Sequence, residues 1–408
     1  MKFKLPNPWK GLGALPRDMW FLFFATLINR AGTMALPFLV LYLTRSIQLS
    51  AAQAGLAISV YGIGALVTAP ISGWLCDRFN PLRIMEISLL TTGGFLFFFP
   101  FLSTYESILA VTFLWAMASE AFRPANLTYV TNAVPAEQRK LAFAFFRLSI
   151  NLGMSIGPAI GGFLAVLSYS ALFYVNATTT LAAGLLLVFS PIRTHHRDHA
   201  ALTGEKETGS SLRAYPATNL RLFWFLAALL PTFAIFFQHE AALPIFMVRD
   251  LHLNEAIYGL MFTINTGLII FLEIPLNLAM EDWPYKRTLP LGALLFGLGF
   301  GLLVFAQDAW FIAMTVVVWT FGEMILFPST ASFLSEIAPS QLRGRYMGFY
   351  QMMVSLAFTI GPWLGTFVLD LYGAVPLWVG CLMAGVLSAG LLLKTTDFLK
   401  TPTSMQSQ

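Results

Sequence analysis

The sequence contains few charged residues and very few cysteines. Only 11% of the 408 residues are Asp, Glu, Lys or Arg, whereas about a quarter are charged in a typical soluble domain. Hydrophobic residues make up 57% of the chain, so the composition excludes a soluble globular protein. The two cysteines, Cys76 and Cys381, are too few for a disulfide scaffold or a cysteine-rich metal module.

The small excess of basic residues does not indicate a nucleic-acid-binding protein. The formal charge is +4, but such proteins gather Lys and Arg on a solvated face, and most of this chain is too apolar to supply one. Signatures of hydrolases, zinc peptidases and phosphate-binding loops are also missing from the sequence. We therefore expect no enzymatic activity, no cofactor and no metal site.

Long apolar runs dominate the chain instead. A helix needs about 20 mainly apolar residues to cross the hydrocarbon core of a bilayer. Runs of this kind predict twelve transmembrane helices, at residues 18–44, 52–76, 82–103, 108–131, 141–166, 170–191, 220–248, 255–281, 288–307, 309–336, 343–369 and 373–394. The first run follows a basic segment, as in a signal peptide, but it is too long for one. We expect it to remain a membrane helix.

The basic residues indicate how these helices are oriented. Alternate threading of the runs places 19 of the 24 Lys and Arg residues in the two tails and in alternate loops, and only Arg45 and Arg249 in the opposite loops. The positive-inside rule then predicts that both termini are cytoplasmic. The organisation we expect is an amino-terminal bundle at 1–191, a flexible cytoplasmic linker at 192–219, a carboxyl-terminal bundle at 220–394 and a cytoplasmic tail at 395–408.

The two halves of the chain repeat each other at a spacing near 204 residues. The repeated features, in order, are Pro70 and Pro275, Asp77 and Asp282, Trp115 and Trp319, Pro124 and Pro328, Pro135 and Pro339, Arg139 and Arg343, Gly157-Pro158 and Gly361-Pro362, and Gly161 and Gly365. Such an ordered series predicts an all-α membrane protein with two pseudo-symmetric six-helix bundles. Parallel repeats of this kind place a binding site near the bilayer midplane, between the halves.

With these features the chain resembles the major facilitator superfamily over essentially its whole length. The segment from Gly73 to Arg83 is similar to the cytoplasmic Gly-x-x-x-Asp-Arg-x-Gly-Arg signature of that family, with Asn80 in place of the second Gly and the later base displaced to Arg83. The resemblance implies a gating role for Asp77, Arg78, Arg83, Asp282 and Arg343. The alternative is an ordinary loop acid with bases that mark the cytoplasmic side.

The fifth run carries a motif similar to that of the drug:proton antiporter branch, from Asn151 to Gly162. Glycines spaced four residues apart form a smooth stripe that lets a neighbouring helix approach closely, and a proline in a membrane helix permits a bend. We expect a helix-packing hinge that comprises Gly153, Gly157, Pro158, Gly161, Gly361 and Pro362. Generic packing of small residues explains the glycines equally well.

Ionisable residues inside the runs are the candidates for function, because a charge at a helix centre costs about 2.5 to 3.5 kcal/mol. The resemblance implies that spans one, four, seven and ten line a central cavity. These spans contain Arg30, Glu120, Arg123, Glu240 and Glu323. Desolvation moves carboxylates toward protonation, whereas guanidinium groups keep their protons. We expect proton coupling at Glu240 and Glu323, and at Glu120 unless Arg123 holds it ionised. A static salt bridge is the alternative for Glu240 and Glu323.

Further polar and aromatic residues of these spans are candidates for substrate binding. They are Arg30, Arg123, Arg147, Asn151, Gln238, His239, Asn265 and Trp319. His239 is also able to titrate beside Glu240. Three histidines at 195, 196 and 199 have loosely metal-like spacing, but no cysteine or acidic cluster accompanies them, so we expect them to be solvated.

The resemblance implies a proton-coupled secondary transporter that exports small amphipathic compounds by alternating access. The segment from Trp319 to Pro328 is similar to the glutamate-bearing tenth helix of some bacterial multidrug exporters. The alternative is proton-driven uptake of peptides, siderophores or other zwitterions, because residues 145–153 are similar to the span-five signature of peptide transporters. We expect a monomer in a bacterial inner membrane, with a small-molecule substrate, protons and lipid as partners and no nucleic acid.

Overall fold

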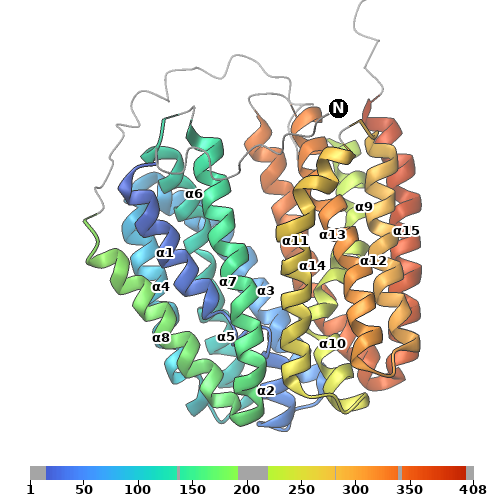
Figure 1. Cartoon of the computed structure of the whole chain (residues 1–408), viewed down its shortest axis with the longest axis horizontal. Helices are drawn as coiled ribbons and strands as arrows, with labels where there is room; N and C mark the ends of the chain where they lie inside the picture. Colours follow the sequence, from blue (N-terminus) through green and yellow to red (C-terminus); the bar gives the residue numbers. More distant parts are fainter. Residues whose placement is uncertain (1–14, 136–137, 192–218, 281, 339–341, 401–408) are drawn as a thin grey trace, which may run out of the picture. The chain divides into compact units, whose positions relative to one another are not determined.

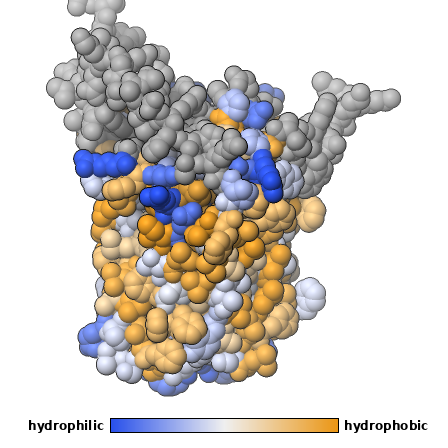
Figure 2. Space-filling model, turned by 90° about the vertical axis from the view of Figure 1, so that its left-hand side faces the viewer, coloured by the Kyte–Doolittle hydropathy of each residue, from blue (hydrophilic) through white to orange (hydrophobic). Residues whose placement is uncertain are grey.

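The computed structural model describes residues 15–135, 138–191, 219–280, 282–338 and 342–400, and these form helices and short connections (Figure 1). Within these ranges there is no β-strand. Ten helical stretches are long and apolar enough to cross a membrane. Figure 2 shows a broad hydrophobic band on one face, bordered by hydrophilic residues at both ends. The expected all-α membrane fold is confirmed.

Close contacts divide the chain into two compact units. Unit 1 comprises Met1–Ala35 and Val67–Gly204, and unit 2 comprises Leu36–Leu66 and Glu205–Gln408. Residues 36–66 therefore pack with helices from the second half of the sequence, although we expected them in the amino-terminal bundle. The expected linker at 192–219, including the three histidines, lies outside the described residues except for its last position.

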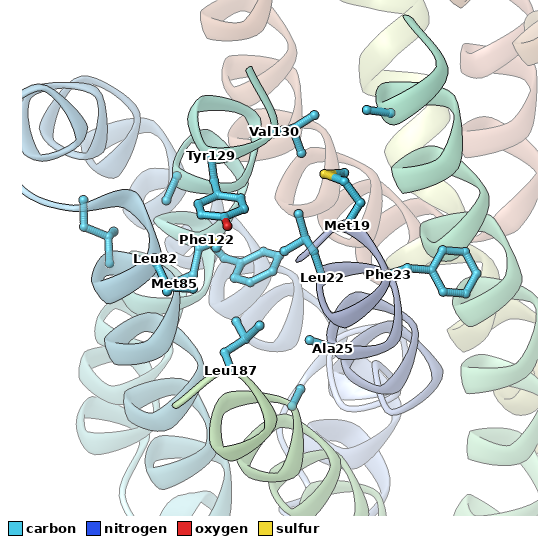
Figure 3. Packing of buried hydrophobic residues seen from close by; sticks show 14 of the residues in the cluster. Met19, Leu22, Phe23, Ala25, Leu82, Met85, Phe122, Tyr129, Val130 and Leu187 are labelled. Carbon is cyan, nitrogen blue, oxygen red and sulfur yellow. The ribbon is translucent and has the colours of Figure 1, made fainter. Parts of the chain in front are cut away.

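Within the described residues, unit 1 contains six α-helices, the end of a seventh and the short helical turn η2 (Phe99–Phe101). The α-helices are α1 (Arg17–Ala31), α4 (Pro81–Phe98), α5 (Tyr105–Glu120), α6 (Phe122–Ala133), α7 (Arg139–Leu167), α8 (Tyr169–Val188) and, from residue 67, α3 (Ala51–Arg78). Figure 3 shows side chains from α1, α4, α6 and α8 converging on one core, with Leu22, Phe122 and Leu187 near its centre. The Tyr129 hydroxyl at its edge donates to Asp18 Oδ2 at 3.2 Å, so this polar group is satisfied against the apolar packing.

Unit 2 contains the remaining helices. They are α2 (Leu39–Arg45), the first part of α3, α9 (Leu220–Phe236), η7 (Phe237–Glu240), α10 (Ala242–Ile245), η8 (Phe246–Asp250), α11 (Glu255–Ala279), α12 (Tyr285–Gly301), η9 (Leu302–Phe305), α13 (Ala309–Ile337), α14 (Arg343–Tyr372) and α15 (Ala374–Lys400). Stacked aromatic rings form its core: the ring centroids of Phe233 and Phe296 lie 5.1 and 6.0 Å from that of Phe327. α15 continues beyond residue 394, where we expected it to end.

Three of the twelve expected spans are broken, at residues 18–44, 108–131 and 220–248. In the first and second of these no piece reaches the required length, which explains why ten stretches are found among the described residues. Residues 18–44 form α1 and α2, and residues 108–131 form α5 and α6, and each of these four pieces has fewer than 18 residues. The other ten spans each correspond to one of the ten stretches. The twelve-span architecture is thus retained, with helix breaks that the apolar pattern does not reveal.

The break after α1 is stabilised by a buried side chain of α8. Asn176 Oδ1 accepts hydrogen bonds from the backbone N–H groups of Met34 and Ala35 at 3.3 and 3.1 Å, and its Nδ2 donates to Thr180 Oγ1 at 3.2 Å. Asn176 is only 4% exposed. Because backbone groups without a partner are costly in an apolar environment, this amide makes the break tolerable.

We expect Asn176→Leu to destabilise the protein by about 1 to 3 kcal/mol, the cost of leaving buried donors unsatisfied. Thermal unfolding of the purified protein in detergent measures the effect as a lower melting temperature. Thr178→Val is the control, because Thr178 is exposed on the same helix and its hydroxyl bonds to the Tyr174 carbonyl of its own helix. Equal melting temperatures for the two variants would contradict this role of Asn176.

Candidate functional site

Glu323 lies inside α13 and is held by Asn265 of α11. Asn265 Nδ2 donates to Glu323 Oε2 at 2.9 Å and lies 3.0 Å from Thr320 Oγ1. Asn265 is 8% exposed and Glu323 is half-buried. Thr320 and Glu323 are three residues apart, so they share one face of α13. The Asn265 amide therefore positions the carboxylate on the face of α13 that meets α11.

Gln238, His239 and Glu240 lie at a break that follows α9. Pro244 has no N–H to bond the carbonyl of Glu240 four residues earlier, and Ala241 leaves the helical conformation at φ −124° and ψ −78°. The chain passes through η7 and the single turn of α10 instead of continuing as one α-helix. The break therefore places Glu240 at the end of a helical segment.

The Gln238 side chain connects this break to α14 by a hydrogen bond. Its Nε2 donates to the Gly361 carbonyl at 2.7 Å and to the Ala234 carbonyl at 2.9 Å. Gly365 leaves room for the amide, because a Cβ atom at that position would collide with Gln238 Oε1. These contacts favour a structural role for Gln238 over the substrate contact expected from the sequence.

The His239 ring faces Glu240 and is oriented by its own backbone. His239 Nδ1 lies 2.6 Å from the Phe236 carbonyl, and Nε2 lies 3.6 Å from Glu240 Oε1. A carbonyl oxygen only accepts, so Nδ1 carries a proton. At 3.6 Å, Nε2 and the Glu240 carboxylate are close enough to attract each other as charges when the ring is protonated, but too far apart for a hydrogen bond.

His239 connects the two carboxylate positions through aromatic contacts. Its ring centroid lies 5.6 Å from that of Phe262 and 5.9 Å from that of Trp319. Phe262 lies one turn before Asn265 on α11, and Trp319 lies one turn before Glu323 on α13. Both rings that contact His239 are thus next to the Asn265–Glu323 hydrogen bond. Trp319 is 4% exposed and stacks on Phe300 at 5.7 Å, which favours packing over substrate contact.

Sequence reasoning missed two residues of this cluster, Thr320 and Tyr258. The Tyr258 hydroxyl lies 3.0 Å from the His239 carbonyl and 3.1 Å from the Pro37 carbonyl. Tyr258, Phe262 and Asn265 occupy one face of α11, at i, i+4 and i+7. That spacing was the available signal for Tyr258.

Arg30 lies one residue before the end of α1, where α7 approaches closely. A Cβ atom at Gly153 would collide with the Arg30 Cβ, and one at Gly157 would lie 2.8 Å from the Arg30 carbonyl oxygen. In unit 2, a Cβ atom at Gly361 would lie 2.8 Å from the Ala234 carbonyl oxygen. Gly361 follows Gly157 by 204 residues, and Ala234 follows Arg30 by the same number. Repeated positions therefore make the same close contact within each unit, so the sequence repeat is also a structural repeat.

The remaining hinge and substrate candidates lie mainly on α7 and α14. Pro158 and Pro362 lie inside these unbroken helices, and Gly161 is buried. Arg147 is exposed and Asn151 is half-buried one turn later on α7. Their roles as hinge and substrate residues stay predictions.

Glu120 and Arg123 do not lie on one continuous helix, which corrects our expectation. α5 ends at Glu120 and α6 begins at Phe122. The physical reason is Pro124, which lacks the N–H that would bond the Glu120 carbonyl. Glu120 is half-buried and Arg123 is exposed. The proposed coupling role of Glu120 stays a prediction.

The candidate gating residues are described only in part. The side chains of Asp77 and Arg343 lie outside the described residues, and Asp282 is exposed after α11. Arg78 and Arg83 line a cavity of unit 1 between α3, α4 and α5. Gating by these five residues stays a prediction.

Comparisons with known proteins agree with this architecture. An uncharacterised MFS-type transporter of Bacillus subtilis, YqjV, is 25% identical over 383 residues, covering 91% of each chain. A Na⁺, Li⁺, K⁺/H⁺ antiporter of Planococcus maritimus is 24% identical and covers 82% of this chain and 84% of its own. The quinolone resistance protein NorA of Staphylococcus aureus is 21% identical and covers 91% and 95%.

A solved structure shows the same fold. The peptide transporter POT in complex with sulfate superimposes with a TM-score of 0.79 over 96% of both chains at 16% identity. The family model described as Major Facilitator Superfamily matches residues 22–249 and 240–406, which together span most of the chain. The duplicated helical architecture and this match lead to one conclusion: the chain belongs to the Major Facilitator Superfamily and is an integral membrane transporter.

Proposed function

We propose that this transporter couples the export of small amphipathic compounds to protons. The observation that carries the proposal is the Asn265–Glu323 hydrogen bond, which places a carboxylate inside a membrane-spanning helix. The His239–Glu240 pair supplies a second protonatable group in the same unit. Two relatives support export and ion exchange, since their names describe quinolone resistance and antiport against H⁺.

The chemistry of Glu323 suits reversible protonation. An ionised carboxylate is purely an acceptor and is stabilised by the Asn265 amide, whereas a protonated one needs an acceptor for its new hydroxyl group. Thr320 Oγ1 and the amide oxygen of Asn265 are acceptor atoms of this cluster. Protonation of Glu323 thus changes the hydrogen bonds between α11 and α13. A substrate that favours one of these arrangements is linked to the proton by that preference.

We further propose that both termini are cytoplasmic, in a bacterial inner membrane. The support is the sorting of Lys and Arg residues among alternate loops of the twelve spans. Fusion of a reporter enzyme that is active only outside the cytoplasm to the carboxyl terminus tests it. Activity of that reporter in intact cells would contradict the orientation.

Transport by the purified protein tests the function directly. We expect proteoliposomes with an acidic interior to take up ethidium, with simultaneous loss of the pH gradient, because an antiporter exchanges internal protons for external substrate. A pH-sensitive dye inside the vesicles and ethidium fluorescence report the two fluxes, and protein-free liposomes are the control. Proton movement with dialanine but not with ethidium would overturn the export proposal in favour of uptake of zwitterions.

A further inference from the structure

We propose that unit 1 binds an anionic phospholipid in a groove between α3, α4 and α5. The groove has a volume of about 950 Å³, and all of its lining residues belong to unit 1. Basic side chains line one end and mainly apolar side chains line the remainder. A ligand that fills it needs a negatively charged head and a hydrocarbon chain. The proposal does not depend on the transported substrate or on proton coupling.

The basic end of the groove carries Arg78 and Arg83. Arg78 is the last residue of α3, and Arg83 lies in the first turn of α4; both are exposed. The Arg78 guanidinium lies 4.3 Å above the Trp74 ring, and this contact orients it. Arginine is well suited to phosphate because its planar donors match phosphate oxygens.

The amino end of α4 adds to this positive field. Helix α4 has 18 residues and begins at Pro81, with Asn80 as its N-cap, so its helix dipole is positive at the same end of the groove. Glu86 lies one turn after Arg83 and does not line the groove. It offsets part of the charge of Arg83, so a test must change both arginines.

The rest of the groove has the length and polarity of one bilayer leaflet. Its lining extends along α3 from Arg78 back to Thr68, ten residues or about 15 Å of helix. That distance is half of the roughly 30 Å hydrocarbon core. Phe79 and Ile87 on its wall are 56% and 64% exposed. A free phosphate would contact only the basic end, whereas a phospholipid also covers these apolar side chains.

The corresponding part of unit 2 has different chemistry. A cavity between α11, α12 and α13 has a volume of about 420 Å³, and its lining includes Glu336 and the hydrogen-bonded pair Tyr285 and Ser332, but no arginine among the described residues. In the sequence repeat, the counterparts of α3, α4 and α5 are α11, α12 and α13. Among the described residues, the cavity at the corresponding place in unit 2 therefore lacks the arginine pair that lines the groove of unit 1.

Native mass spectrometry of the purified full-length protein tests the proposal. In detergent with equal amounts of dioleoylphosphatidylglycerol and dioleoylphosphatidylcholine, we expect retention of the anionic lipid to exceed that of the zwitterionic lipid by about tenfold, or about 1.4 kcal/mol. The double variant Arg78→Gln, Arg83→Gln loses this preference. Arg287→Gln keeps it, because Arg287 is exposed, lies 204 residues after Arg83 and does not line the unit 2 cavity.

A second variant tests the hydrocarbon end of the groove. Thr91 is exposed and lines the groove, so Thr91→Trp fills the space of the acyl chain while both arginines stay. We expect this variant to retain less phosphatidylglycerol than the wild type, with the same helical content by circular dichroism. Glycerol 3-phosphate, which lacks acyl chains, should not compete with the lipid.

Three results would overturn the proposal. Equal retention of both lipids by the wild type would exclude recognition of the head group. An unchanged preference in the folded double arginine variant would place the lipid elsewhere. Competition by glycerol 3-phosphate as effective as that by phosphatidylglycerol would identify a simple anion site instead of a lipid site.

Discussion

Glu323→Gln should abolish proton-driven ethidium transport while ethidium exchange continues. Glutamine has the shape of glutamate and keeps an amide oxygen that accepts from Asn265 Nδ2, which lies 2.9 Å from Glu323 Oε2, but it cannot carry the transported proton. We expect the rate driven by a pH gradient to fall at least about tenfold, equivalent to about 1.4 kcal/mol. Exchange of labelled for unlabelled ethidium across the liposome membrane should stay within about twofold of the wild type.

Glu336→Gln is the matched control for this experiment. Glu336 lies on the same helix, α13, but is exposed near its end, so the same chemical change should leave driven transport intact. A Glu323→Gln protein that still accumulates ethidium against a gradient would remove Glu323 from the coupling mechanism. Loss of exchange together with driven transport would instead show that the side chain is needed for substrate binding.

Gly157→Val should prevent α7 from packing against α1 and so reduce both stability and transport. A Cβ atom at Gly157 would lie 2.8 Å from the Arg30 carbonyl oxygen and 3.0 Å from the Ala31 carbonyl oxygen. These atoms are backbone, so they cannot rotate away as a flexible side chain could. We expect a loss of about 1 to 3 kcal/mol or more, as for other overpacked interiors, measured as lower melting temperature and lower yield of monodisperse protein.

Gly94→Val provides the comparison. Gly94 lies inside α4, and a Cβ atom there has no described non-neighbouring atom within 4 Å. The same residue exchange in a helix of the same unit should therefore cost little. A Gly157→Val protein as stable as Gly94→Val would show that α1 and α7 can separate without penalty, and would contradict close packing at this site.

Much of the fold could be predicted because a membrane imposes strong rules on sequence. Hydrocarbon cannot bond backbone groups, so each spanning segment is a helix of sufficient length, and the apolar runs locate all twelve. The breaks in spans one and four could not be placed from the same pattern. The break in span one depends on satisfaction of the backbone by Asn176, which bonds Met34 and Ala35 from more than 140 residues away. The break in span four lies at Pro124, but an internal proline alone does not predict a break, because α7 and α14 continue through Pro158 and Pro362.

The sequence indicates the residue types of the candidate site, but it does not indicate their hydrogen-bond partners. A glutamate is conspicuous in an apolar run, so the positions of Glu240 and Glu323 in spans seven and ten made them candidates, and their role in coupling stays a prediction. Their partners were not identified, because Asn265 reaches Glu323 from 58 residues away in sequence and Tyr258 is an ordinary residue of an apolar helix. Gln238 shows the converse limit: it has the chemistry of a ligand-binding residue but bonds to the backbone of α14.

The prolines that follow Glu120 and Glu240 by four residues have a mechanical implication. Each proline lacks the N–H that would bond the carbonyl of the acidic residue four positions earlier. A carboxylate and a helix break therefore occupy the same turn of the chain. If either carboxylate titrates during transport, its charge therefore changes beside an interruption of its own helix.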